Sequence, residues 1–268
     1  MRDAMRKKGL YFTVFTLAIL FVYQTTGFAA GGKGNIKQLG EKMYIWHFDE
    51  GKGKETKDAT AGLVGTFTGD IKWGEGISGN ALEFSGKVGK PQHVEVPHSD
   101  EVDIDEALTM AAWIYPNELP TGGQENKFTI FFKLSYYMQI EPNGGKIAYY
   151  FYEAAPEGYH ISDGGVKAKE WSHVAVVWDG KQANFYINGK KDTKVIAQKG
   201  PGRSNKNGVR IGGEDAGCCP RFFQGRVDEV ALANYALSED ELQKLIKEGL
   251  AVSAKGKLAI TWGQIKSR

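Results

Sequence analysis

The sequence predicts an antiparallel β-sandwich in which two packed sheets form one all-β domain of the 268-residue chain. From Met43 to Tyr235, short runs rich in β-branched and aromatic residues alternate with glycine turns, which is typical of such a fold. The 35 glycines exceed the usual share of about 7%, as expected where many tight turns need a positive φ. One sandwich can account for this length, because such domains reach roughly 200–250 residues.

Individual strands are expected wherever a β-rich run lies between two turn signals. These runs cover residues 44–49, 81–84, 93–96, 108–115, 128–134, 136–140, 146–152, 171–178, 182–187, 209–211 and 226–232.

The clearest local pattern is a pair of consecutive hairpins. Asp179-Gly180 and Asn188-Gly189 separate three β-rich runs, and these dipeptides readily adopt the two positive φ values of a type I′ turn. In the middle run, Ala183 and Phe185 alternate with polar residues. The alternation predicts one buried face and one solvated face.

A short helix is expected near the C-terminus. Ser238 and Glu241 form a capping box, in which each side chain satisfies a backbone N–H of the other residue. Leucine and isoleucine then recur at helical spacing, and Gly249 ends the pattern. We expect this helix at the edge of the sandwich. The extension over residues 250–268 is either an added strand or a disordered tail.

The N-terminus predicts export. Residues 1–30 combine a basic start, an apolar run and small residues before Ala30, as in a signal peptide. An uncleaved anchor is the alternative, although the apolar run is shorter than the ~20 residues of a membrane span. Residues 31–42 would be a flexible leader to a domain over 43–249.

The charge of the chain argues against nucleic-acid binding. The net charge is only +2, and the sequence shows no concentrated basic face that could neutralise phosphates.

Two adjacent cysteines, Cys218 and Cys219, are the only ones in the chain. Neighbouring Cα atoms are ~3.8 Å apart, below the ~4.4–6.8 Å of an ordinary disulfide. A strained vicinal disulfide, two free thiols and an intermolecular bridge therefore all remain open.

Five motifs, in the same order along the chain, resemble the laminin-G-like (LamG) branch of the concanavalin A-like jelly rolls. They are WHFDEG at 46–51 leading to Asp58, GNALEF at 79–84, LTMAAWI at 108–114, WSHVA at 171–175 with its Asp-Gly turn, and GRVDEV at 225–230. The resemblance implies an antiparallel two-sheet jelly roll and a secreted, non-catalytic module that binds carbohydrate or an extracellular protein. A purely structural or adhesive module is an alternative.

The resemblance also implies that the first and last strands pair, which would bring Asp49 and Asp228 onto neighbouring strands. Two close carboxylates could share a structural calcium ion with backbone carbonyls, and Glu50 and Asn80 are possible further ligands. The alternative is that Asp49 and Asp58 make turn hydrogen bonds and Asp228 faces water or Arg226.

Two further patterns bear on function. In a strand, Glu101, Asp103 and Asp105 would share one face, as the carboxylates of related glucanases do, so a glycoside hydrolase using residues 101–106 is an alternative. A solvated acidic loop is the commoner fate of such a run.

Aromatic residues provide the expected ligand surface, because a tyrosine offers a flat apolar face and a hydroxyl to a sugar. The ligand-binding residues we expect are Tyr136, Tyr150, Tyr152, Tyr159 and Arg221, with Phe222 and Phe223 extending an exposed patch beside Arg221. Tyr149 and Phe151, on the other face of their strand, are expected between the sheets.

Overall fold

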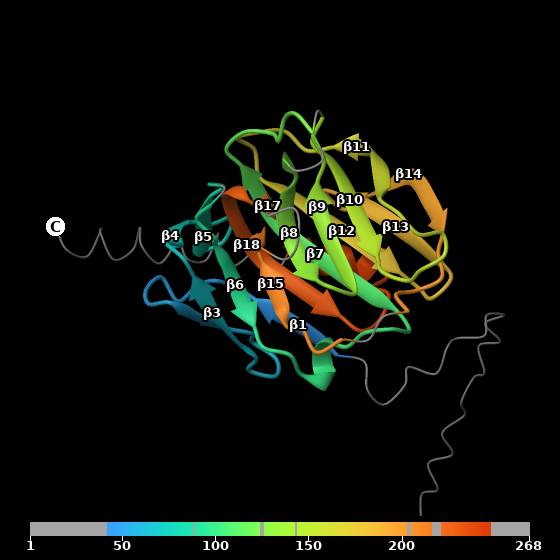
Figure 1. The fold of residues 1–268 in the computed structure, drawn as a ribbon, viewed down its shortest axis with the longest axis horizontal. Coiled ribbons are helices and arrows are strands. Elements are labelled where there is room, and N and C mark those ends of the chain that lie inside the picture. Colours follow the sequence, from blue (N-terminus) through green and yellow to red (C-terminus); the bar gives the residue numbers. More distant parts are fainter. Residues whose placement is uncertain are drawn as a thin grey trace, which may run out of the picture. The chain divides into compact units, whose positions relative to one another are not determined.

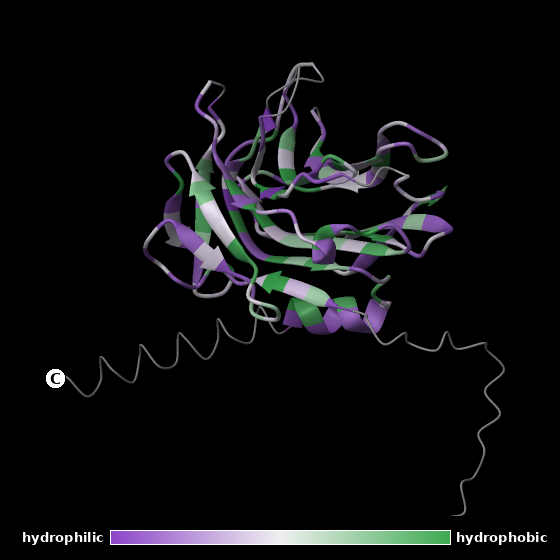
Figure 2. Ribbon diagram, turned by 60° about the horizontal axis from the view of Figure 1, so that its bottom comes forward, coloured by the Kyte–Doolittle hydropathy of each residue, from purple (hydrophilic) through white to green (hydrophobic). Residues whose placement is uncertain are grey.

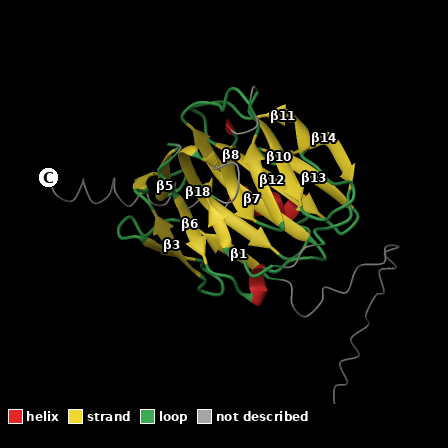
Figure 3. Ribbon diagram, in the orientation of Figure 1, coloured by secondary structure: helices red, strands yellow, loops and turns green. Residues whose placement is uncertain are grey.

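The computed structural model describes residues 42–247, except for 88, 124–125, 143, 203–204 and 216–220. Within these residues the chain forms two antiparallel 8-stranded sheets that pack as a sandwich (Figures 1 and 3). The predicted fold class is confirmed. The expected signal segment, the leader up to residue 41, the C-terminal extension and the pair Cys218 and Cys219 lie outside the described residues.

The first sheet contains the hairpins that the sequence predicts. Its strand order is β14 (Lys190–Ala197), β13 (Gln182–Ile187), β12 (Ser172–Trp178), β7 (Leu108–Pro116), β18 (Gln224–Ala233), β5 (Asn80–Ser85) and β4 (Lys72–Glu75), and β1 (Met43–Trp46) also pairs with β18. The expected pairing of the first and last strands is thus present, with Trp46 opposite Val230.

The second sheet faces the first across the core. Its order is β11 (His160–Gly165), β10 (Lys146–Phe151), β9 (Tyr136–Ile140), β8 (Phe128–Lys133), β15 (Val209–Ile211), β6 (His93–Val96), β3 (Val64–Thr68) and β2 (Glu55–Lys57). A small two-stranded sheet, β16 (Gly213–Glu214) and β17 (Arg221–Phe222), lies near β8.

Large apolar side chains from both sheets fill the space between them. Trp46 and Trp178 of the first sheet and Tyr149 and Phe151 of the second belong to one continuous buried cluster. The expected inward position of Tyr149 and Phe151 is confirmed. Successive side chains of a strand point to opposite faces of its sheet, so the neighbours of these residues point away from the core. The outward side chains of the second sheet form the candidate site described below.

The two hairpin turns differ in conformation. Asn188 and Gly189 both have positive φ, +52° and +72°, as a type I′ turn requires. At the other turn only Gly180 is left-handed, because the Asp179 carboxylate accepts hydrogen bonds from the backbone N–H groups of Lys181 and Gln182. Both hairpins form as predicted, but the one at Asp179-Gly180 uses side-chain capping in place of a type I′ turn.

The capping box begins a helix over residues 239–247. Ser238 N donates to Glu241 Oε2 at 2.8 Å, and Glu241 N donates to Ser238 Oγ at 3.3 Å. The helix lies on the outer face of the first sheet and not at the edge that we expected (Figure 2). Leu242 and Leu245 cover Tyr186 there, so the outer face of β13 is buried and the prediction of a solvated face was wrong. None of the described helices is long and apolar enough to cross a bilayer.

Candidate functional site

The outer face of β9 and β10 carries stacked tyrosines. Tyr136 and Tyr149 point into the core, so Tyr137 and Tyr150 point outward, and the strand register sets these two directly opposite each other. Tyr137 in turn lies opposite Phe132 of β8. Cross-strand aromatic pairs of this kind stabilise a sheet while leaving ring surface on its outer side.

Four tyrosines form what we call the tyrosine cluster: Tyr137, Tyr150, Tyr152 and Tyr159. The rings of Tyr137 and Tyr150 are parallel within 2°, with centroids 5.2 Å apart. Tyr159 stands edge-on to Tyr150 at 5.2 Å, and Tyr152 packs beside Tyr150 at 5.1 Å. Tyr137 is 6% exposed and lies at the base, whereas the other three are partly exposed.

Two hydroxyls of this cluster, those of Tyr137 and Tyr150, have a raised pKa. Burial, together with the hydrogen bond that its hydroxyl donates to Glu157 at 2.8 Å, raises the pKa of Tyr150 to about 12. Tyr137 donates to the hydroxyl of Tyr159 at 3.2 Å, and burial raises its pKa as well. The cluster therefore presents apolar ring faces together with hydroxyl groups, and those of Tyr137 and Tyr150 stay neutral at physiological pH.

A group of charged and amide side chains adjoins the tyrosines, and we call it the polar cluster: Lys127, Gln139, Glu141, Glu214 and Arg221. The ammonium of Lys127 lies 2.7 Å from Glu141 Oε1 and 3.1 Å from the centroid of the Tyr159 ring. The side chain of Lys127 is fully buried, and this burial lowers its pKa. The cation thus links the polar cluster to the tyrosine cluster.

The second half of the polar cluster comes from the small sheet. Register places Glu214 opposite Arg221, and Arg221 donates to Glu214 Oε2 at 3.4 Å. Gln139 Nε2 donates to the same oxygen at 3.3 Å. Burial raises the pKa of Glu214, while the Gln139 Oε1 atom is buried without a hydrogen-bond partner among the described residues.

The structure brings together Tyr150, Tyr152, Tyr159 and Arg221, as residues of one continuous face. Tyr136 is different, because at its position in β9 the side chain points into the core. It is fully buried, and its hydroxyl donates to Val102 O at 2.6 Å, so the expectation that it contacts a ligand was wrong.

The expected exposed patch beside Arg221 is also absent from the described residues. Arg221 is 8% exposed, Phe222 3% and Phe223 0%, because Phe223 packs into the core against Phe128. Sequence reasoning missed Lys127, Gln139, Glu141 and Glu214. Gln139 and Glu141 had a usable signal, since they are polar residues two apart, in and directly after an otherwise apolar strand.

The acidic run at 101–106 does not form a strand. The glucanase hypothesis requires its carboxylates on one face of a strand, and the described structure does not have that arrangement. Asp100–Val102 is a 3₁₀ turn, and Val102 and Ile104 are buried beneath it. Asp103 pairs with the buried ammonium of Lys133 at 2.8 Å. This run fastens a loop to the sandwich.

The candidate metal ligands meet at the turn between β4 and β5. Asp49 Oδ1 accepts from Asn80 N at 3.0 Å, and Asp228 Oδ2 accepts from Ile77 N at 2.9 Å and from Ser78 N at 3.2 Å. Glu50 lies elsewhere, because its Oε1 accepts from Thr56 Oγ1 and Lys57 N. The structure therefore places Asp49, Asn80 and Asp228 around one turn and separates Glu50 from them.

Two carboxylates and a buried hydroxyl surround this turn. A Cβ at Gly76 would collide with Asp228, and one at Gly79 would collide with Asp49, so the two carboxylates lie directly against the turn. Ser78 Oγ is buried there without a partner among residues that the structure describes, and burial raises the pKa of Asp228 to about 8. No set of three or more His, Cys, Asp or Glu side chains converges anywhere in the described chain, so neutral oxygens would complete such a site.

Comparison with known families bears directly on this fold. A laminin-G type profile described as the concanavalin A-like lectin/glucanases superfamily matches residues 88–243, more than half of the chain. The chain belongs to this superfamily. The family resemblance carried by the five sequence motifs is confirmed. No curated protein sequence is significantly similar to this concanavalin A-like chain.

Several solved structures share the fold. Domain 4 of AbnA, an extracellular arabinanase of Geobacillus stearothermophilus solved with arabinotriose, has a TM-score of 0.56 at 18% identity, covering 77% of this chain and 98% of that domain. The binding domain of Paraclostridial Mosquitocidal Protein 1 has a TM-score of 0.55 at 13% identity, over 76% of this chain and 51% of that chain. Trypanosoma rangeli sialidase matches at 0.56 and 15% identity, over 76% of this chain and 32% of the enzyme. At these identities the likeness concerns the concanavalin A-like fold alone.

Proposed function

We propose that this domain is exported and binds a saccharide through the tyrosine cluster and the adjoining polar cluster. The observation that carries the proposal is the set of partly exposed rings of Tyr150, Tyr152 and Tyr159, which pack at an angle to one another on the outer face of the second sheet. Ring faces suit the C–H surfaces of a sugar, and the neighbouring hydroxyl, amide and charged groups suit its hydroxyls. The arabinotriose complex of the similarly folded arabinanase domain supports this ligand class. The basic and apolar segment at residues 1–30 supports export.

The proposed role is binding without bond cleavage. Glycoside hydrolysis needs one carboxyl group as acid and a second as nucleophile or base. Here Glu141 is held by Lys127, and Glu214 is held by Arg221 and Gln139, so each carboxylate of the polar cluster has a structural partner. Hydrolysis of any array glycan by the purified chain would contradict this part of the proposal.

A glycan array followed by titration calorimetry tests the binding. We expect Tyr150→Ala and Tyr152→Ala each to weaken binding of the captured glycan about tenfold, the equivalent of ~1.4 kcal/mol, because each removes one ring face. Tyr115→Ala is the matched control, since Tyr115 is also partly exposed but stacks with Trp171 on the first sheet. Capture of no glycan, or equal affinities for all variants, would overturn the proposal.

We also propose a structural calcium ion held by Asp49, Asp228 and the orphaned Ser78 hydroxyl, with carbonyls of the 76–80 turn. The ion would neutralise a buried carboxylate and fasten the turn to the last strand. Calcium should raise the free energy of unfolding by about 2.7 kcal/mol when its free concentration is a hundred times Kd. Thermal unfolding with calcium and with chelator measures this increment.

Asp228→Asn should remove the calcium increment. Glu50→Gln is the control and should retain it, because Glu50 binds Thr56 and Lys57 away from the turn. Equal unfolding temperatures with and without calcium in the unaltered chain would contradict the metal site.

A further inference from the structure

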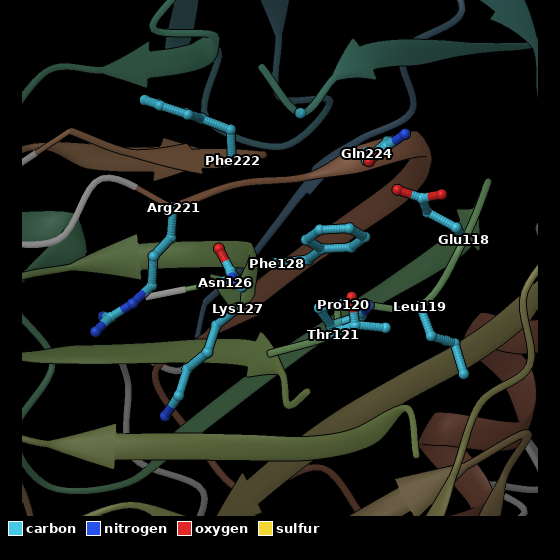
Figure 4. Close-up of a pocket in the computed structure, with 11 residues that line it drawn as sticks. Glu118, Leu119, Pro120, Thr121, Asn126, Lys127, Phe128, Arg221, Phe222 and Gln224 are labelled. Carbon is cyan, nitrogen blue, oxygen red and sulfur yellow. The ribbon is translucent and has the colours of Figure 1, made fainter. Parts of the chain in front are cut away.

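A pocket of about 260 Å³ adjoins the polar cluster (Figure 4). Its walls come from the loop after β7, the start of β8 and the stretch from β17 into β18. The residues that matter here are Glu118, Thr121, Asn126, Phe128 and Gln224. The Phe128 ring supplies an apolar surface, and the other four supply hydrogen-bonding groups around it.

Two long side chains belong to both the pocket and the binding face. Lys127 and Arg221 line the pocket, and in Figure 4 they run side by side away from Phe128. Their charged ends reach Glu141 and Glu214 of the polar cluster. Since the Lys127 ammonium also lies over the Tyr159 ring, a single side chain separates the pocket from the tyrosine cluster.

A backbone hydrogen bond joins two of the segments that line the pocket. Asn117 N donates to Gln224 O at 3.0 Å, which ties the loop after β7 to the start of β18. The volume is also below the ~300–1,000 Å³ of pockets that hold drug-sized ligands. The pocket thus has room for about one sugar ring, with Glu118 and Gln224 together at one side of it (Figure 4).

We propose that the domain recognises the end of a saccharide chain, with the terminal sugar in this pocket and the following sugars on the tyrosine cluster. This inference rests on the saccharide binding proposed above and specifies its ligand class. Phe128 would face the C–H surface of the terminal ring, and Glu118, Asn126 and Gln224 would bond its hydroxyls. A polymer would therefore bind only at its ends.

Four polysaccharides serve as probes: linear arabinan, xylan, mannan and mixed-linkage glucan, each before and after limited acid hydrolysis. For every polymer that binds, we expect the number of protein molecules bound per gram to rise in proportion to the chain ends that hydrolysis creates. Binding capacity that follows total sugar and ignores the number of ends would overturn the inference but leave the proposed function intact. Absence of binding to all eight preparations would overturn both.

A pocket-filling variant provides an independent readout. Thr121 is exposed at the pocket, so Thr121→Trp should fill it and weaken binding at least tenfold without lowering the unfolding temperature. Thr60→Trp, at an exposed turn distant in sequence from the pocket, is the matched control and should bind normally. If Tyr150→Ala weakens binding while Thr121→Trp does not, the chain-end inference fails and the tyrosine site stands.

Discussion

Replacing Lys127 with methionine should destabilise the fold by about 3–5 kcal/mol, because it leaves a carboxylate buried without its counter-charge. The Lys127 side chain is fully buried, and that of Glu141 is 6% exposed, with 2.7 Å between nitrogen and oxygen. Chemical denaturation at neutral pH measures the loss. A change below ~1 kcal/mol would mean that Glu141 readily finds water or another partner.

Two further variants separate charge burial from a general loss of packing. The double variant Lys127→Met with Glu141→Leu should regain most of the stability, since a buried pair can be replaced by apolar residues of similar volume. Lys167→Met is the surface control: its 3.6 Å pair with Glu170 leaves the two side chains 76% and 60% exposed. Its loss should be no more than ~0.5–1 kcal/mol.

Acid should destabilise the protein through His173. This residue lies opposite Trp113 in the first sheet, and within the described chain neither ring nitrogen has a hydrogen-bond partner. Complete burial lowers the pKa of His173 to about 3, so the native state keeps the ring neutral. In the unfolded chain the ring binds a proton below its ordinary pKa of 6.5. The contribution is therefore fully present above pH 6.5 and is lost as the pH falls toward 3.

The expected loss is about 4 kcal/mol by pH 3.5, at ~1.4 kcal/mol per pH unit. His173→Leu should remove this part of the acid dependence while leaving stability at pH 7.5 equal or higher. Trp113→Phe is the control, because it also removes a buried, unpartnered N–H but keeps the histidine. Identical pH profiles for the unaltered chain and His173→Leu would show that the native state admits the proton.

The strands that the sequence predicts best are those flanked by other strands. For β6, β9, β13 and β15 the expected bounds agree with the structure, because their apolar side chains face a shared core. The strands β2, β3, β4 and β11 escaped prediction. Three of them, β2, β4 and β11, lie at the ends of their sheets and are short, polar or rich in glycine, and β3 has one fully buried residue, Gly65, so little burial marks these strands in the sequence.

The candidate site was predictable only in part. Period-two alternation correctly separated outward Tyr150 from inward Tyr149, and the same rule applied to β9 would have assigned Tyr136 to the core. Glu214 could not be found in this way. It reaches Gln139 through the pairing of β16 with β17, a contact between residues 75 positions apart. The acidic run could serve a hydrolase only as a strand, and it forms a loop in which Asp103 pairs with buried Lys133.

Tyrosine-selective NMR during a titration with the captured glycan shows directly whether a saccharide contacts the outer face of the second sheet. The chain has 12 tyrosines, which sample both faces and the core. We expect the chemical shifts of Tyr150, Tyr152 and Tyr159 to change with the bound fraction. Those of the core residues Tyr44 and Tyr149 should stay unchanged. Shifts confined to Tyr115 on the opposite sheet, with the tyrosine cluster unchanged, would contradict the assignment.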